Sequence, residues 1–297
     1  MKPLKIGIFG QFYHDDADIY LRKLLEIIKR ENAQASIEKK FFKSLKKRLP
    51  EPDIILEYPV FENLDKSFDL FLSIGGDGTM LKTISKIKDL GVPLAGINTG
   101  RLGFLASIPK DAMDESVTKI LRGDYTCSQR SLLSVSVTPE NEDITKLNFA
   151  LNDVGILRKN TTSMIKIEAF LNGEYLNTYW SDGLIISTPT GSTAYSLSCG
   201  GPIMYPTVNS FILTPIAPHN LNVRPIVIPD DTEIKLKISG RDKNYLLSLD
   251  SRVAVLPDLS EIVLKKAPFQ VNLIQLQEES FIKTLRKKML WGEDKRN

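Results

Sequence analysis

The sequence predicts an α/β domain with a Rossmann-like parallel sheet, followed by an all-β domain of the β-sandwich type. Apolar strand patterns alternate with amphipathic helix patterns over residues 1–123, and short strand patterns follow one another over residues 124–277. A last helical pattern lies in residues 278–297, and we expect this helix to pack back on the first domain. Because a chain of 297 residues exceeds the size at which single cores usually stop growing, two domains are expected.

The first domain is expected to alternate strand and helix. A helix with Ala17 and Leu21 on its apolar face follows the first strand. Residues 31–66 are ambiguous, because prolines break them into loops and short pieces. A later helix is expected to be capped by Asp111 and stopped by Gly123. The strands are expected at residues 5–9, 70–74 and 92–97.

The second domain is expected to consist of strands, with scarcely a helical period among them. Asn172-Gly173 is a strong hairpin turn between two of these strands. The final helix is expected over about residues 280–290, with Ile282, Leu285 and Met289 facing inward. The strands are expected at residues 134–138, 149–157, 164–171, 175–180, 184–187, 224–228, 234–238, 245–249, 261–265 and 271–276.

The composition is that of a soluble globular protein. A formal net charge of +3, from 39 basic and 36 acidic residues, is too small an excess to argue for nucleic acid. The densest basic run, residues 39–48, is interpreted as the solvated face of a short helix or loop. No signal peptide or membrane span is visible, so we expect no membrane partner and a cytoplasmic location.

Few residues are available for a zinc site or for disulfides. The cysteines, Cys127 and Cys199, are far apart and outside any metal-type spacing, so we expect both to be reduced and buried. With only His14 and His219 in the chain, a His/Cys zinc site is excluded. We interpret His219 as structural, and we assign no residue as a metal ligand.

One turn in the first domain predicts phosphate chemistry. The apolar run over residues 70–74 ends in Gly75-Gly76-Asp77-Gly78-Thr79, and a helical pattern follows. Glycines take positive φ freely and let an anion approach the main chain, and amides at a helix start favour phosphate. The Asp77 carboxylate would repel phosphate unless it accepted a proton from a reacting hydroxyl or held a metal ion. This combination points to phosphoryl transfer.

The same residues also fit an ordinary tight turn, in which Asp77 bonds its own backbone. The pattern matches neither the dinucleotide fingerprint G-x-G-x-x-G nor the Walker A loop. Taken alone, the turn leaves open both another kind of nucleotide site and a structural turn.

Residues 182–202 form a second unusual stretch, rich in Ser and Thr hydroxyls and small residues and almost free of long charged side chains. Such a run can hydrogen-bond ribose and amide groups. The alternative is a Ser/Thr-rich surface loop, but solvated loops rarely contain pairs such as Ile185-Ile186. We therefore favour a ligand-binding surface.

With these motifs in hand, the sequence resembles the NAD kinase family over residues 5–291. The Gly75–Thr79 turn alone is shared with phosphofructokinases and diacylglycerol-type lipid kinases, whereas the run over residues 188–196 is far more specific. The matching motifs, in chain order, are residues 75–79, 98–105, Asn152-Asp153, 182–202, 218–221, Arg224-Pro225 and Asp250-Ser251.

The resemblance implies ATP-dependent phosphorylation of the 2′-hydroxyl of the adenosine ribose of NAD, giving NADP. It also implies a divalent metal ion, usually magnesium, and a homotetramer or dimer. Asp77 would be the general base and would contact NAD with Gly78. NAD would then lie in a crevice between the two domains. The other residues implied to contact NAD are Asn152, Asp153, Asp182, Thr193, Ala194, Tyr195, Ser196, Leu197 and Ser198.

The chain departs from the family pattern at individual contacts. Asp153 stands where the family usually has Glu, Trp180 where a basic residue is common, and Arg252 where Gln is common. We add Trp180 and Arg252, together with Ser163, to the candidates for the same pocket. Two other functions stay open: a lipid kinase that shares the turn, and a sensor that binds NAD(P) without turnover. The retained Asp77 argues against the sensor.

Overall fold

The computed structural model describes residues 3–11, 17–49, 53–159 and 163–292. The chain forms two compact units, one of residues 1–129 with 271–297 and the other of residues 130–270. These boundaries lie a few residues from those expected at 123/124 and 277/278. His14, which the zinc argument counted, lies outside the described residues.

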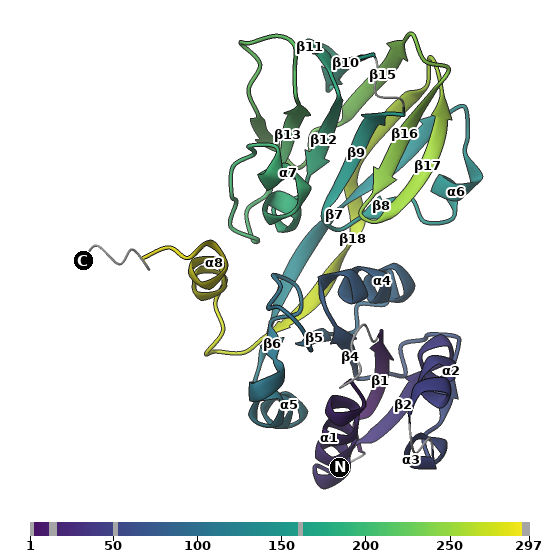
Figure 1. The fold of residues 1–297 in the computed structure, drawn as a ribbon, viewed down its shortest axis with the longest axis vertical. Helices are drawn as coiled ribbons and strands as arrows, with labels where there is room; N and C mark the ends of the chain where they lie inside the picture. The colour runs from purple at the N-terminus through teal and green to yellow at the C-terminus, as the bar shows by residue number, and fades with distance from the viewer. Residues whose placement is uncertain (1–2, 12–16, 50–52, 160–162, 293–297) are drawn as a thin grey trace. The chain divides into compact units, whose positions relative to one another are not determined.

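The first unit contains a parallel sheet in the order β5-β4-β1-β2-β3 (Figure 1). Each neighbouring pair in this order is parallel, and β4 is buried along its whole length. The end of β18 (Glu261–Gln275) adds a further parallel pairing, with Leu273 beside Leu94 of β5. The strands are β1 (Lys5–Gly10), β2 (Gln34–Glu38), β3 (Val60–Phe61), β4 (Leu70–Gly75), β5 (Leu94–Asn98) and β6 (Ile108–Pro109).

Helices cover this sheet and complete its core. The buried side chains of α1, α2 and α5 join those of the strands in one apolar cluster, and α1 lies beside α5 (Figure 1). This confirms the α/β expectation for the first domain. The helices are α1 (Ala17–Arg30), α2 (Lys39–Arg48), α3 (Asp53–Leu56), α4 (Asp77–Ile87), α5 (Met113–Leu121) and α8 (Phe281–Met289).

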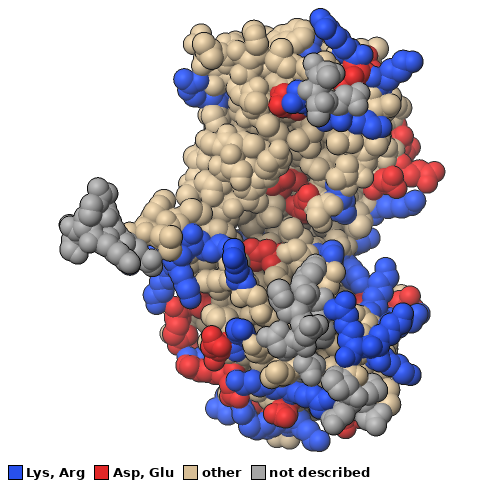
Figure 2. Space-filling view, viewed as in Figure 1, with Lys and Arg blue, Asp and Glu red and all other residues tan. Residues whose placement is uncertain are grey.

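The basic run forms α2, with Phe41 and Leu45 buried and most of its lysines exposed. Figure 2 shows Lys and Arg side chains gathered over the part of this unit where α2 lies. The interpretation as a solvated helix face is therefore confirmed.

Two details of the first unit differ from the sequence expectations. Asp111 lies in a 3-10 turn, Lys110–Ala112, and α5 begins after Ala112 without a side-chain cap, so Asp111 does not cap the helix. In α8, only Leu285 is buried, whereas Ile282 is 49% exposed. α8 also contacts Phe104 of this unit, through the ring of Phe281 at 6.2 Å and through Lys288, whose Nζ lies 5.8 Å from the ring centre.

The second unit consists of two antiparallel sheets with one apolar core between them, which confirms the β-sandwich expectation. One sheet has the order β14-β13-β12-β9-β16-β17, and the other contains β11-β10-β15-β18, with β7 beside β18 and β8 beside β7. Short helical pieces, η2 (Thr190–Thr193) and α7 (Tyr195–Ser198), follow β12. The strands are β7 (Thr126–Thr138), β8 (Phe149–Ala150), β9 (Asp153–Arg158), β10 (Ile165–Leu171), β11 (Glu174–Ser181), β12 (Gly183–Ser187), β13 (Ser210–Ile216), β14 (Ile226–Pro229), β15 (Ile234–Gly240), β16 (Asn244–Leu249), β17 (Arg252–Pro257) and β18 (Glu261–Gln275), with helix α6 (Glu142–Thr145).

Several strands of this unit differ from the expected ones. The sequence did not indicate β13 or β17, and the two strands expected over residues 261–276 are the single strand β18. The Asn172-Gly173 hairpin turn is confirmed, since both residues have positive φ, 50° and 84°. Both cysteines are free, but Cys127 is exposed and Cys199 half-buried, so the expectation of buried cysteines is wrong.

Candidate functional site

The phosphate turn lies at the carboxyl end of β4, where ligands of parallel sheets usually bind. Gly75 has a φ of 148°, and a Cβ there would lie 2.3 Å from the Thr79 hydroxyl oxygen. Any other residue at position 75 would therefore be strained and crowded. The expected strand, turn and helix are confirmed, but only Gly75 among the three glycines uses positive φ.

Gly76 and Gly78 are not required by the packing of the chain. Gly76 has a φ of −110°, and a Cβ on either glycine would meet no described atom within 4 Å. The N–H groups of Asp77 and Gly78, at the start of α4, have no hydrogen-bond partner among the described residues. Bare glycines beside unpaired helix-start amides give an anion room to reach the main chain.

The Asp77 carboxylate is held by a loop that follows β5. Its Oδ2 accepts a hydrogen bond from the Phe104 amide at 2.8 Å, and its Oδ1 accepts from the Leu105 and Ala106 amides at 3.0 and 2.9 Å. A carboxylate has about four lone-pair positions on its two oxygens. Because Oδ1 accepts two bonds and Oδ2 only one, Oδ2 keeps a position for one more proton donor.

Two residues shape that loop around Asp77. A Cβ on Gly103 would lie 1.9 Å from Asp77 Oδ1, so this position has no room for a side chain. The Asn98 amide donates to the Arg101 carbonyl at 2.8 Å, and Asn98 Oδ1 accepts from the Gly100 amide at 2.8 Å. The loop residues matched by the sequence motif therefore position the carboxylate.

A pocket of about 420 Å³ adjoins the turn, and the sequence analysis missed it. Thr79 lines it with a buried hydroxyl that has no partner among the described residues. Lys82 lines it as well, donating to Gln11 Oε1 at 2.6 Å. Lys82 follows Gly78 by four residues, and this helical spacing could have indicated that it lies on the face of the turn. Lys40 adds further positive charge, whereas Lys86 forms an ion pair with Glu38, which lines the pocket as well.

The second unit gathers another group of candidates around Asp250. The Asp250 carboxylate accepts hydrogen bonds from the amides of Leu151 and Asn152, at 3.1 and 2.7 Å, and from that of Asp153 at 3.3 Å. The Asp250 amide donates back to the Asp153 carbonyl at 3.0 Å. Asp250 thus fixes the main chain that carries Asn152 and Asp153.

Asp153 is 6% exposed and connects this group to α7. Burial, with the nearby Asp250 carboxylate, raises the pKa of Asp153 to about 7, although a hydrogen bond from the Tyr195 amide opposes the shift. Burial also raises the pKa of Asp250. The protonation of Asp153 therefore changes near neutral pH.

This raised pKa predicts that stability falls as pH rises. The folded state keeps the Asp153 proton up to about pH 7, whereas the unfolded chain releases it near the ordinary value of 3.8. The free energy of unfolding should therefore decrease between about pH 4 and 7, by about 4 kcal/mol from this group, and level off above. Denaturant titrations of wild type and Asp153→Asn at pH 5 and 8 test this. The variant should lack this part of the pH dependence. An equal change in the free energy of unfolding between pH 5 and 8 in the two proteins would contradict the prediction.

Several hydroxyls of the hydroxyl-rich run, residues 182–202, are buried. Thr188 donates to the Leu151 carbonyl at 2.5 Å, Ser192 to the Pro189 carbonyl at 2.7 Å, and Ser196 shares a 2.8 Å bond with Thr214. These three hydroxyls already have partners inside the unit. The candidates that remain accessible are Thr193, Ala194, Tyr195, Leu197 and Ser198, with Tyr195 42% exposed.

The remaining candidates have partners of their own. Asp182 forms an ion pair with Arg158, 2.9 Å between Oδ2 and Nη2. Ser163 donates to Asp242 Oδ2 at 3.2 Å, which connects it to the turn after β15 rather than to Asp153. Trp180 is 47% exposed, and its carbonyl accepts from the His219 amide at 2.8 Å.

Arg252 is the first residue of β17. Its guanidinium donates to the Leu147 carbonyl at 2.6 Å and to the Phe149 carbonyl, and it lies 5.4 Å from the centre of the Phe149 ring. These contacts give Arg252 a structural role next to Asp250.

Neither a metal cage nor a membrane helix is found in the part of the chain that the structure describes. No three His, Cys, Asp or Glu side chains lie close enough together there to hold a metal ion. The described helices are all too short or too polar to cross a bilayer.

Family models and curated proteins both match this chain. The model of the ATP-NAD kinase N-terminal domain matches residues 6–125, and that of the C-terminal domain matches residues 151–276. The NAD kinase of Christiangramia forsetii is 52% identical over 99% of this chain and 100% of its own length. The NAD kinase of Porphyromonas gingivalis is 42% identical over 97% of this chain and 98% of its own length.

Solved structures show the same fold. The yeast NADH kinase complexed with NADH superposes with a TM-score of 0.87 at 23% identity, covering 100% of this chain and 90% of that one. The NAD kinase from Archaeoglobus fulgidus in complex with ATP gives a TM-score of 0.73 at 22% identity, covering 95% and 99%. With both domain models matched and full-length relatives above half identity, this chain belongs to the NAD kinase family.

Proposed function

We propose that this chain transfers a phosphoryl group from ATP to the 2′-hydroxyl of the adenosine ribose of NAD, giving NADP. Asp77 is the general base. The observation that carries this proposal is the arrangement at Asp77, whose carboxylate is fixed by three amides and keeps one acceptor position on Oδ2. A fixed base beside a bare glycine turn meets the needs of a reaction that depends mostly on positioning and charge.

Each group of candidates has a part in this reaction. The turn amides and the Thr79 hydroxyl bind phosphate oxygens of the donor, and Lys82 balances its charge from the adjoining pocket. The accessible residues around Tyr195 contact the dinucleotide, together with Asn152 and Asp153. Asp182 and Arg252 hold neighbouring parts of the second unit rather than the ligand.

The residues fit a magnesium ion that arrives with the triphosphate. Magnesium keeps several waters and is usually held by one or two carboxylates and the substrate phosphates, so no protein cage is needed. Asp77 would hold such an ion at the same Oδ2 position that otherwise takes the acceptor proton, so the two roles exclude each other at any one moment. When bound, the ion would neutralise charge on the phosphates, and the chain's own residues would still fix the base and the acceptor.

The acceptor class is tested by offering the purified chain NAD, diacylglycerol and sphingosine separately, each with ATP and magnesium. NAD should be phosphorylated and the lipids should not, because the exposed residues around Tyr195 present hydroxyl, amide and aromatic groups. Lipid phosphorylation at a rate comparable with that of NAD would overturn the proposal.

Tyr195 tests the dinucleotide-binding group. Its exposed ring can pack on a flat ligand, so Tyr195→Ala should raise the KM for NAD more than it lowers kcat, because stacking holds ground state and transition state alike. Steady-state kinetics measures the split, with Tyr175→Ala, an exposed tyrosine on β11, as the matched control. An unchanged KM for NAD would remove Tyr195 from the site.

We further propose that the chain acts in the cytoplasm as a homotetramer or dimer. Its free cysteines suit a reducing compartment, and the family resemblance supports the oligomer. Light scattering coupled to gel filtration would measure the mass.

A further inference from the structure

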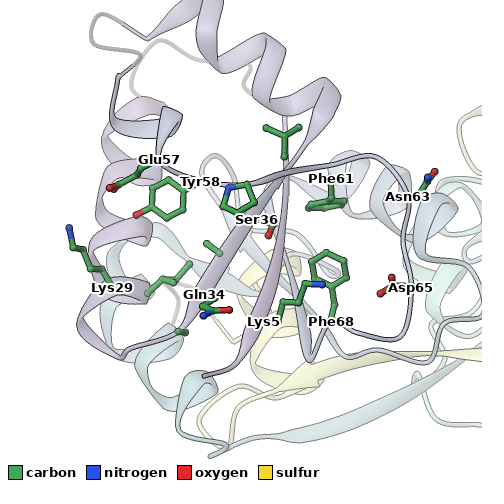
Figure 3. A pocket seen from close by; sticks show the side chains of 15 residues that line it. Lys5, Lys29, Gln34, Ser36, Glu57, Tyr58, Phe61, Asn63, Asp65 and Phe68 are labelled. Carbon is green, nitrogen blue, oxygen red and sulfur yellow. The ribbon is translucent and has the colours of Figure 1, made fainter. Parts of the chain in front are cut away.

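A second pocket, of about 690 Å³, lies at the opposite end of the first unit's sheet (Figure 3). Lys5 and Gln34, the first residues of β1 and β2, line it, whereas the phosphate turn follows the last residue of β4. Six strand residues at about 3.3 Å each separate the two ends by about 16 Å or more. The pocket shares no residue with either group of site candidates, and its volume is in the range of small-molecule sites.

Its walls are aromatic. Figure 3 shows Tyr58 on one side of the pocket and Phe61 and Phe68 on the other. The rings of Phe61 and Phe68 lie 5.0 Å apart, and Lys5 Nζ lies 4.4 Å from the centre of the Phe68 ring. Tyr58 and Phe61 are only half-buried, so each leaves part of its ring to a flat ligand. Phe68, in contrast, is buried and supports Phe61 from behind together with Phe9.

At the floor of the pocket, the backbone N–H and C=O of Ala35 have no hydrogen-bond partner among the described residues. In β2, Gln34 donates toward β1, to the Leu4 carbonyl, and Ile37 donates toward the other side, to the Pro59 carbonyl. Because N–H and C=O directions alternate along a parallel strand, Ala35 also presents both groups to the side of Pro59. Pro59 has no N–H to donate, and no described residue bonds either group of Ala35. Ala35 itself is 5% exposed, and buried backbone groups are rarely left unpaired.

The charges around the pocket are balanced. Lys5 and Lys29 line it together with Glu57 and Asp65. Lys5 Nζ already donates to Ser67 Oγ at 2.6 Å. This balance favours an uncharged ligand over a phosphate-bearing one.

We propose that this pocket binds an uncharged, flat heteroaromatic molecule of the adenine-nucleoside class. An adenine edge carries an amino donor beside a ring-nitrogen acceptor, which complement the Ala35 carbonyl and amide. Its faces stack against the half-buried rings of Tyr58 and Phe61, as bases stack on aromatic side chains elsewhere. The site is separate from the proposed NAD and ATP contacts.

Hydrogen exchange tests the proposal locally, with adenosine as the probe and the full chain as the sample. Adenosine should protect the amides of residues 33–38 in a saturable way, and the same protection should appear with NAD and ATP present. Tyr58→Ala should weaken this protection about tenfold, equivalent to about 1.4 kcal/mol, while Tyr175→Ala should leave it unchanged. Adenosine 5′-monophosphate should bind no more tightly than adenosine.

Three results would overturn the proposal. Absence of protection at residues 33–38 at millimolar adenosine would remove the site. Protection confined to the phosphate turn or to residues 188–198 would place adenosine in the proposed substrate site instead. Binding of the monophosphate more than tenfold tighter than adenosine would show that the pocket selects charge. None of these results depends on whether the chain phosphorylates NAD.

Discussion

Asp77→Asn should lower kcat by about 10²–10⁴, equivalent to about 3–5 kcal/mol, while NAD affinity stays within a few-fold. The ribose hydroxyl is a poor nucleophile and must lose its proton as the phosphoryl group arrives. An asparagine oxygen can keep the two bonds that Asp77 Oδ1 accepts, from Leu105 and Ala106. Its amide nitrogen cannot take the proton. Steady-state kinetics and calorimetric titration with NAD measure the two effects.

The asparagine also changes one structural contact. Its NH₂ group would face the Phe104 amide, which now donates to Oδ2, and two donors would meet there. We therefore expect a loss of about 1–2 kcal/mol of folding stability as well. Turnover near the wild-type rate would refute the base assignment. Loss of NAD binding together with folding would make Asp77 a structural turn residue.

Gly103→Ala should produce a comparable loss of kcat without touching a chemical group. The added Cβ would lie 1.9 Å from Asp77 Oδ1, so the carboxylate or the loop must move. A displacement of about 1 Å at a reacting group can cost about 10²-fold in rate. We therefore expect kcat to fall at least about 10²-fold while KM for NAD changes little.

Gly100→Ala is the matched control for this substitution. Gly100 lies in the same loop, but a Cβ there would lie 4.0 Å from Asn98 Oδ1, an ordinary contact. Its amide, which donates to Asn98, is kept in alanine. Equal losses in the two variants would show that the loop is merely sensitive to any change, and an unaffected Gly103→Ala would contradict the close contact with Asp77.

The parts of the site that are contiguous in sequence could be predicted. The glycine turn at the end of β4 follows from an apolar run that stops at Gly75, and the turn, helix and aspartate were placed correctly. The contacts of Asp77 could not be predicted, because Phe104, Leu105 and Ala106 follow it by 27 to 29 residues. Only the folded sheet brings the ends of β4 and β5 together.

In the second unit, too, contacts between residues far apart in the sequence could not be predicted. Arg252 looked available for a ligand, but its partners are carbonyls 105 and 103 residues away. The hydroxyls after β12 looked like a ligand surface because their composition is polar, yet Thr188, Ser192 and Ser196 bond within the unit. The long strand β18 was divided in two because Lys265, Lys266 and Pro268 interrupt its apolar alternation.

The central claim, phosphoryl transfer to the 2′-hydroxyl of NAD, is tested most directly by following the label from ATP carrying radioactive phosphorus at its γ position. The purified chain, with magnesium, is given NAD in one sample and an NAD analogue lacking the adenosine 2′-hydroxyl in the other. We predict that the label appears in NADP from NAD and that the analogue stays unlabelled. Labelling of the analogue, or ATP consumption with NAD left unlabelled, would contradict the account.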